Sequence, residues 1–222
     1  MLVFFYKEWI KTRYFFLIAL VLSVLFCVYA MLNINRVIEL KGAAHIWEVM
    51  LQRDAIFIHY LRFVPLLMGA VAGMMQFVPE MQQKRIKLTL HLPCSSLHSL
   101  GAMLLFGAGL LILISLVNLL LLDIFLLQHF AVELVRRIIL TGIVWYVAGL
   151  AAYFFTAWIC LEPTWKMRVF ALLVAVAVLR IFFISETPEA YNAFLPLLVV
   201  YTLLAASLPF WSVKRLKDGK QD

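Results

Sequence analysis

The sequence has 222 residues, of which 65% are hydrophobic and 14% are charged. Its mean hydropathy is +1.00, and because soluble globular domains are only about half apolar, this composition excludes a water-soluble fold. The formal net charge is +7, but the basic residues lie mainly at the ends of apolar blocks. That placement indicates membrane topology and argues against nucleic-acid binding.

The first predicted element is an amphipathic helix over residues 2–13, lying along the membrane surface. Its two faces differ in polarity, with Leu2, Phe5, Tyr6, Trp9 and Ile10 on one and Lys7, Glu8, Lys11 and Thr12 on the other. One alternative is a simple extension of the first span. Another is a signal peptide that ends near Val28-Tyr29-Ala30, but the long aromatic segment before the apolar run favours an uncleaved span.

Six apolar blocks follow, each about the 17–25 residues that a helix needs to cross a bilayer. The predicted spans are residues 14–31, 56–78, 97–122, 138–161, 169–185 and 193–211. A polar stretch from Asn33 to Asp54 separates the first two spans and contains a candidate surface helix over 43–51, and Pro79 is expected to end the second span. The prediction is therefore an all-α membrane protein, a single domain over residues 1–222.

Lysine and arginine set the predicted orientation. With the N-terminus in the cytoplasm, the inner segments hold twelve of these residues and the outer segments hold six. Every inner segment is basic, which favours an even number of spans with both termini in the cytoplasm. We therefore expect a multi-pass protein of the cell (inner) membrane, surrounded by membrane lipids.

We expect no catalytic residue, no metal ion and no bound cofactor. No phosphate-binding loop of the form G-x-x-x-x-G-K-[ST] occurs, and no nucleophile has a recognisable partner. Arg180 is the one candidate for a buried charged group inside a span, since His59 and Arg62 are expected at the outer end of theirs, and charged groups within the membrane usually have a function. The spacing favours an outward ion pair with Glu186 or Glu189 over contact with a substrate.

Gly69 and Gly73 form a G-x-x-x-G pattern in the second predicted span. This spacing lets two helix backbones approach closely. Such patterns are common in membrane helices, so we expect it to pack against another helix of the same chain in preference to forming a dimer seam.

The segment from Glu80 to Pro93 combines a carboxylate, a basic run, and Leu-x-Leu-x-Leu-Pro before the next span. It resembles the cytoplasmic loop of type-2 ATP-binding-cassette (ABC) exporter permeases, a family that also has an N-terminal elbow helix followed by six spans. The chain departs from the family pattern at Lys84-Arg85-Ile86-Lys87, where the family has Gly-Thr, and in the short segment between the last two spans.

The resemblance implies that the 79–96 segment couples the membrane domain to a separate ATPase subunit. Its implied coupling residues are Glu80, Met81, Lys84, Arg85, Ile86, Lys87, Leu88 and Pro93. The implied partners are an ABC ATPase and a second permease, either the same chain or a sister chain, with no nucleic acid. The alternatives are a segment held only by lipid phosphates, a non-catalytic membrane scaffold or assembly factor, and an intramembrane lipid-modifying enzyme.

Overall fold

The computed structural model describes residues 2–42, 58–82, 96–185 and 187–219. All regular structure in these ranges is helical. In chain order the elements are α1 (Leu2–Lys41), the short 3₁₀ helix η1 (His59–Leu61), α3 (Val64–Gln82), α5 (Ser96–Leu127), α6 (Val132–Leu161), α7 (Trp165–Ile181), α8 (Leu195–Ala205) and α9 (Leu208–Lys217). The candidate surface helix at 43–51 lies outside the described residues.

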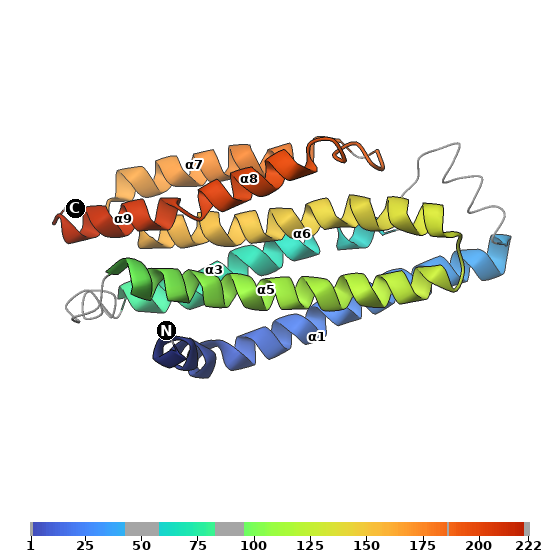
Figure 1. Ribbon diagram of the computed structural model, residues 1–222, viewed down its shortest axis with the longest axis horizontal. Helices are drawn as coiled ribbons and strands as arrows, with labels where there is room; N and C mark the ends of the chain where they lie inside the picture. The colour runs from blue at the N-terminus through green and yellow to red at the C-terminus, as the bar shows by residue number, and fades with distance from the viewer. Residues whose placement is uncertain (1, 43–57, 83–95, 186, 220–222) are drawn as a thin grey trace.

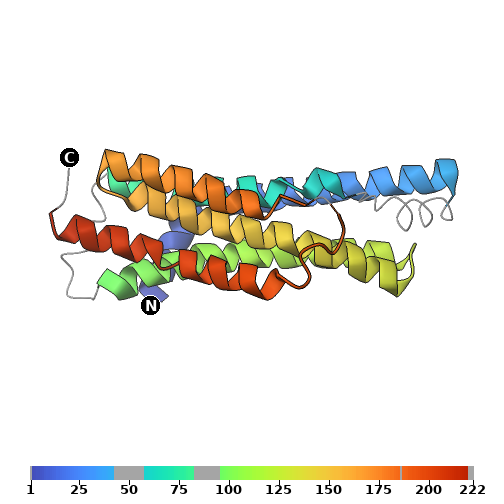
Figure 2. The same cartoon turned by 90° about the horizontal axis from the view of Figure 1, so that it is seen from above.

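The long helices lie side by side in one elongated bundle and alternate in direction along the chain, with α8 and α9 running in the same direction one after the other (Figures 1 and 2). Both chain termini lie at the same end of the bundle. Helix α6 is central, because it packs against α3, α5, α7, α8 and α9. Its interior face carries aromatic and small side chains, including Trp145, Tyr153 and Ala157.

Within the described residues, five helical stretches are long and apolar enough to cross a membrane: Phe5–Leu40, His59–Gln82, Leu97–Leu127, Val132–Leu161 and Leu195–Lys217. Many large apolar side chains on these stretches point outward, as Leu17, Leu113 and Leu203 do, and this surface suits lipid and not water. The chain is therefore a multi-pass helical membrane protein. Helix α7, in the position of the fifth predicted span, has only 17 residues, or about 26 Å at 1.5 Å per residue.

Helix α1 is longer than the sequence pattern predicts. One continuous helix covers both the predicted amphipathic helix and the first span, and it continues past Met31 to Lys41. Neither proline nor glycine occurs between Leu2 and Lys41, so nothing in that stretch interrupts the backbone hydrogen bonds. The first, dark-blue turns of α1 nevertheless point away from the long axis of the bundle (Figures 1 and 2).

The structure departs from the predicted spans near two prolines. Pro79 was expected to end the second span, but it lies inside α3, which continues to Gln82. A proline removes one helical hydrogen bond, and the three further residues show that α3 tolerates this loss. The last predicted span is instead divided into α8 and α9 around Ala206 and Ser207, and Pro209 occupies the first turn of α9, where its missing N–H is not needed.

The G-x-x-x-G pattern packs inside the chain, as predicted. A Cβ atom on Gly69 would overlap the backbone of Gly149 in α6, and one on Gly73 would come within 2.9 Å of Thr156 Cβ. A Cβ atom on Gly149 would in turn lie 2.6 Å from the carbonyl oxygen of Pro65. Helices α3 and α6 thus approach each other so closely at this contact that only glycine fits there.

Candidate functional site

A cluster of polar side chains is enclosed where α1, α3, α5 and α6 meet, toward the end of the bundle that holds both termini. We call it the polar cluster, and its members are Lys7, Glu8, Lys11, Gln76, Glu80 and Tyr153. Glu8, Gln76, Glu80 and Tyr153 are each at most 1% exposed. Buried polar groups at this density destabilise a fold unless they bond to one another.

Gln76 is the centre of the polar cluster. Its Nε2 donates hydrogen bonds to Glu8 Oε2 (3.0 Å) and to the backbone oxygen of Met103 (2.8 Å). Its Oε1 accepts a hydrogen bond of 2.7 Å from the Tyr153 hydroxyl. A Cβ atom on Gly107 would overlap both the Tyr153 hydroxyl and Gln76 Oε1. One amide from α3 therefore joins α1, α5 and α6.

Glu80 lies one turn after Gln76 and is held by two lysines of α1. Lys11 Nζ is 2.9 Å from Glu80 Oε1 and also donates to the backbone oxygen of Gln76 at 2.7 Å. Lys7 Nζ lies 3.3 Å from the same carboxylate oxygen. These ion pairs offset the cost of removing the Glu80 carboxylate from solvent, and they fix the N-terminal turns of α1 to the end of α3.

Lys11 also faces Glu8, at 3.6 Å from Glu8 Oε2. The second carboxylate oxygens, Glu8 Oε1 and Glu80 Oε2, are buried and have no hydrogen-bond partner among the described residues. The polar cluster is therefore incompletely satisfied among the described residues, and each unpaired buried oxygen carries an energetic cost.

A second buried carboxylate, Glu162, lies just after α6. Arg215 Nη1 is 2.7 Å from Glu162 Oε1, and Ser212 Oγ donates to Glu162 Oε2 at 2.5 Å. Arg168 Nε donates to the backbone oxygen of Glu162 at 2.7 Å. This acid holds α9 and the start of α7 against the end of α6. Acids on α3 and after α6 therefore anchor helices from opposite ends of the sequence.

The predicted coupling residues are only partly described. Glu80 is buried in the polar cluster, and Met81 is half-buried against the main hydrophobic core. The remaining predicted residues lie outside the described residues: Lys84, Arg85, Ile86, Lys87, Leu88 and Pro93. The structure thus places the first two coupling residues inside the bundle, at the point where α3 ends.

Arg180 is exposed in the last turn of α7. One of its two predicted partners, Glu189, instead lies 4.0 Å from Arg137 of α6, while Glu186 is outside the described residues. Sequence analysis considered only Arg180 as a buried charged group inside a span, whereas the structure buries Glu8, Glu80 and Glu162, each only 1% exposed.

Sequence analysis missed most of the polar cluster. It placed Glu8 and Lys11 on a face directed away from the membrane interior, whereas both side chains turn toward α3, and Trp9 and Ile10 are the exposed ones. The sequence did contain one signal of a buried polar cluster, which is Gln76, a large amide within an otherwise apolar block. Polar residues inside membrane helices usually find partners on a neighbouring helix.

The chain matches no protein-family model, no curated protein and no solved structure. Within the parts of the chain that the structure describes, no three His, Cys, Asp or Glu side chains gather as metal ligands do. The polar cluster offers instead a set of ion pairs and hydrogen bonds that connect four helices beside the end of α3. Its geometry is suited to transmitting a displacement between helices.

Proposed function

We propose that this chain is the membrane-spanning permease subunit of an ABC transporter that works as an exporter. A separate ATPase subunit binds the 79–96 segment and drives the chain through it. The support from sequence is the resemblance of the Glu80–Pro93 segment to the family's cytoplasmic loop. The support from structure is a helical membrane bundle in which both termini lie at the end where α3 reaches Gln82.

The buried position of Glu80 is the observation that carries the proposal. A permease must convert motion of its partner into rearrangement of its helices, so the coupling segment has to be attached firmly to several of them. Glu80 starts that segment and is held by Lys11 and Lys7 of α1. Gln76, one turn earlier, bonds to α5 and α6. A pull on the 79–96 segment would therefore act on four helices at once.

The complete transporter in this proposal contains two permease chains and two ATPase subunits. The second permease is either a copy of this chain or a sister chain, and the apolar outer faces of the bundle leave room for it. The bent first turns of α1 serve as the elbow helix along the cytoplasmic surface, and α7 completes a set of six spans. Both termini and the 79–96 segment lie in the cytoplasm.

The experiment replaces the apolar residues that would anchor the ATPase. Ile86→Asp and Leu88→Asp put a charge into the proposed docking surface, where buried apolar side chains supply most of the binding energy. Each tagged full-length variant is purified with its ATPase, and the ATP hydrolysis rate is measured per copurified complex. We expect both variants to lose the partner or its stimulation.

Lys87→Ala is the matched control, since an exposed ion pair contributes under about 1 kcal/mol. It should retain the partner and most of the stimulated rate. Wild-type binding and stimulation in both Asp variants would refute the coupling role of this segment. A copurifying partner without ATP hydrolysis in the wild-type complex would favour a membrane scaffold.

A further inference from the structure

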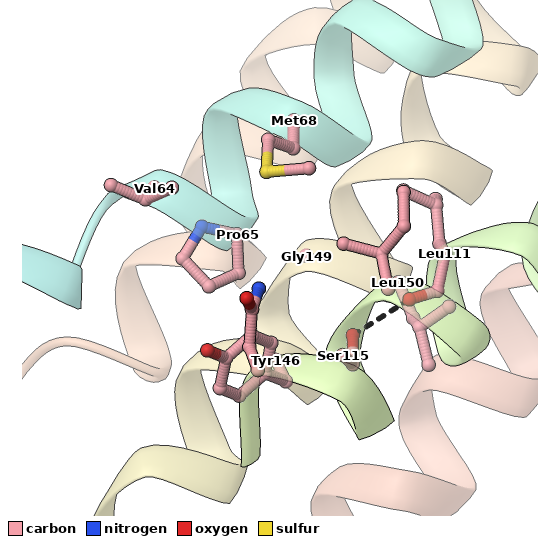
Figure 3. Close-up of a pocket in the computed structure, with 10 residues that line it drawn as sticks. Val64, Pro65, Met68, Leu111, Ser115, Tyr146, Gly149 and Leu150 are labelled. Atoms are coloured by element: carbon pink, nitrogen blue, oxygen red, sulfur yellow. Dashed lines mark hydrogen bonds between the residues drawn. The ribbon is translucent and has the colours of Figure 1, made fainter. Parts of the chain in front are cut away.

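A small cavity lies in the interior of the bundle between α3, α5 and α6 (Figure 3). Its volume is about 20 Å³. Helix α3 contributes Pro65 and Met68, α5 contributes Ser115 and Asn118, and Tyr146 of α6 closes another side. It adjoins the close backbone contact between Pro65 and Gly149 and is separate from the polar cluster.

Three polar side chains face this cavity from two helices, and their hydrogen bonds are incomplete. The Asn118 side chain lies within hydrogen-bonding reach of the Tyr146 hydroxyl, and Asn118 Oδ1 is buried and has no partner among the described residues. Ser115 Oγ uses its proton on the backbone oxygen of Leu111, at 2.7 Å (Figure 3), and keeps its lone pairs free to accept. The Tyr146 hydroxyl has one proton that it can donate.

We propose that this cavity binds one ordered water molecule. The water donates its two protons to Asn118 Oδ1 and Ser115 Oγ and accepts the proton of the Tyr146 hydroxyl. Three hydrogen bonds of this kind are typical of a buried water, and the site needs roughly 10–15 Å³ to hold one. The cavity of about 20 Å³ is large enough, and Asn118, Ser115 and Tyr146 in its lining supply three polar partners.

The chemistry of the lining favours water over other occupants. No lining residue carries a formal charge, so a metal cation would find too few oxygen ligands and no compensating carboxylate. A lipid tail or a small organic molecule needs far more volume. The apolar part of the lining, which includes Val64, Met68 and Leu150, keeps the water in one place. The proposal concerns the interior of α3, α5 and α6 and does not depend on the ABC assignment.

Radiolytic labelling of the purified full chain in lipid nanodiscs tests the site. X-ray pulses convert bound water to hydroxyl radicals, which oxidise the side chain beside them before they diffuse away. Tyr146 should be oxidised although it is only 9% exposed. Tyr153 is the matched control on the same helix, because it is also buried but its hydroxyl already donates to Gln76. We expect Tyr146 to be labelled faster than Tyr153.

Asn118→Leu removes the acceptor that the water needs and should abolish the labelling of Tyr146. Ser115→Ala removes one acceptor with little change in shape and should reduce it. The proposal is overturned if wild-type Tyr146 is labelled no faster than Tyr153, a comparison that requires no variant to fold. It is also overturned if either folded variant labels Tyr146 at the wild-type rate.

Discussion

Lys7 and Lys11 contact the same carboxylate oxygen of Glu80, but they differ in depth. The Lys7 side chain is 40% exposed, whereas that of Lys11 is 15% exposed. Water screens the outer ion pair and leaves it weak. The inner lysine also satisfies the backbone oxygen of Gln76, so its removal leaves that carbonyl without its donor and the Glu80 carboxylate with only the more exposed Lys7.

Lys11→Met should destabilise the bundle by about 3 kcal/mol, the cost expected when one partner of a buried ion pair is removed. Lys7→Met should cost less than about 1 kcal/mol. The measurement is the free energy of unfolding of the two purified variants in detergent. Equal losses for the two lysines would contradict the difference in depth.

A double variant distinguishes the loss of the Lys11–Glu80 ion pair from the loss of side-chain packing at Lys11. Glu80→Gln removes the buried charge that Lys11→Met leaves behind, so Lys11→Met combined with Glu80→Gln should recover part of the lost stability. If the double variant is less stable than Lys11→Met alone, the two residues do not act as an ion pair.

At the scale of the elements, α3 and α6 pack so closely that glycine is required at their contact. A Cβ atom on Gly149 would lie 2.6 Å from Pro65 O and 2.9 Å from Pro65 C. Backbone atoms cannot swing aside as a flexible side chain does, so an added methyl group forces the two helices apart.

Gly149→Ala should lower the free energy of unfolding by about 1–3 kcal/mol through this overpacking. Gly109→Ala is the control, because a Cβ atom there meets nothing within 4 Å. In the middle of α5 it should stabilise the helix by about 1 kcal/mol, since alanine is the better helix former. Thermal unfolding followed by circular dichroism compares the two. If Gly149→Ala left the free energy of unfolding unchanged, α3 and α6 would be less tightly packed at this contact than the structure shows.

Local sequence patterns predicted the existence of the elements better than their limits. The apolar blocks predicted the positions of α5 and α6 well, because each is a long apolar run between polar segments. They placed the end of the first span at Met31, because the polar residues after it indicate a loop, yet α1 continues to Lys41. Neither proline nor glycine interrupts that stretch, so the helix continues through it although it contains several polar residues.

The polar cluster could not be derived from local patterns for a different reason. Gln76 meets Glu8 and Tyr153 across 68 and 77 residues of sequence. Which polar side chains share a buried site therefore depends on the order in which the helices pack. Only Glu80 was singled out beforehand, from its position in the segment that resembles a coupling loop, and its partners on α1 were not foreseen.

At the scale of the whole molecule, each ion pair joins two segments that the distribution of basic residues assigns to the same side of the membrane. Glu80 pairs with Lys11, and Glu162 pairs with Arg215, all four on the predicted inner side. Arg137 and Glu189 are both predicted outside, and they lie 4.0 Å apart. The two termini also lie at the same end of the bundle (Figure 1). The packing is thus consistent with an even number of crossings.

Accessibility of single cysteines in intact cells tests the sidedness directly. In a chain without Cys27, Cys94 and Cys160, Lys41→Cys and Glu189→Cys should react with a membrane-impermeant maleimide. Lys41 ends α1, and Glu189 is largely exposed beyond α7; both are at the end away from the termini. The positive-inside bias places that end outside.

Lys217→Cys, in the last turn of α9, is the control for the opposite side and should react only after the cells are permeabilised. Labelling of Lys217→Cys in intact cells, with protection of both other positions, would invert the orientation. Labelling at only one of the two outer positions would mean that an odd number of crossings separates Lys41 from Glu189. In that case α7, with its 17 residues, would be the first helix to re-examine as a full span, because it lies directly before Glu189.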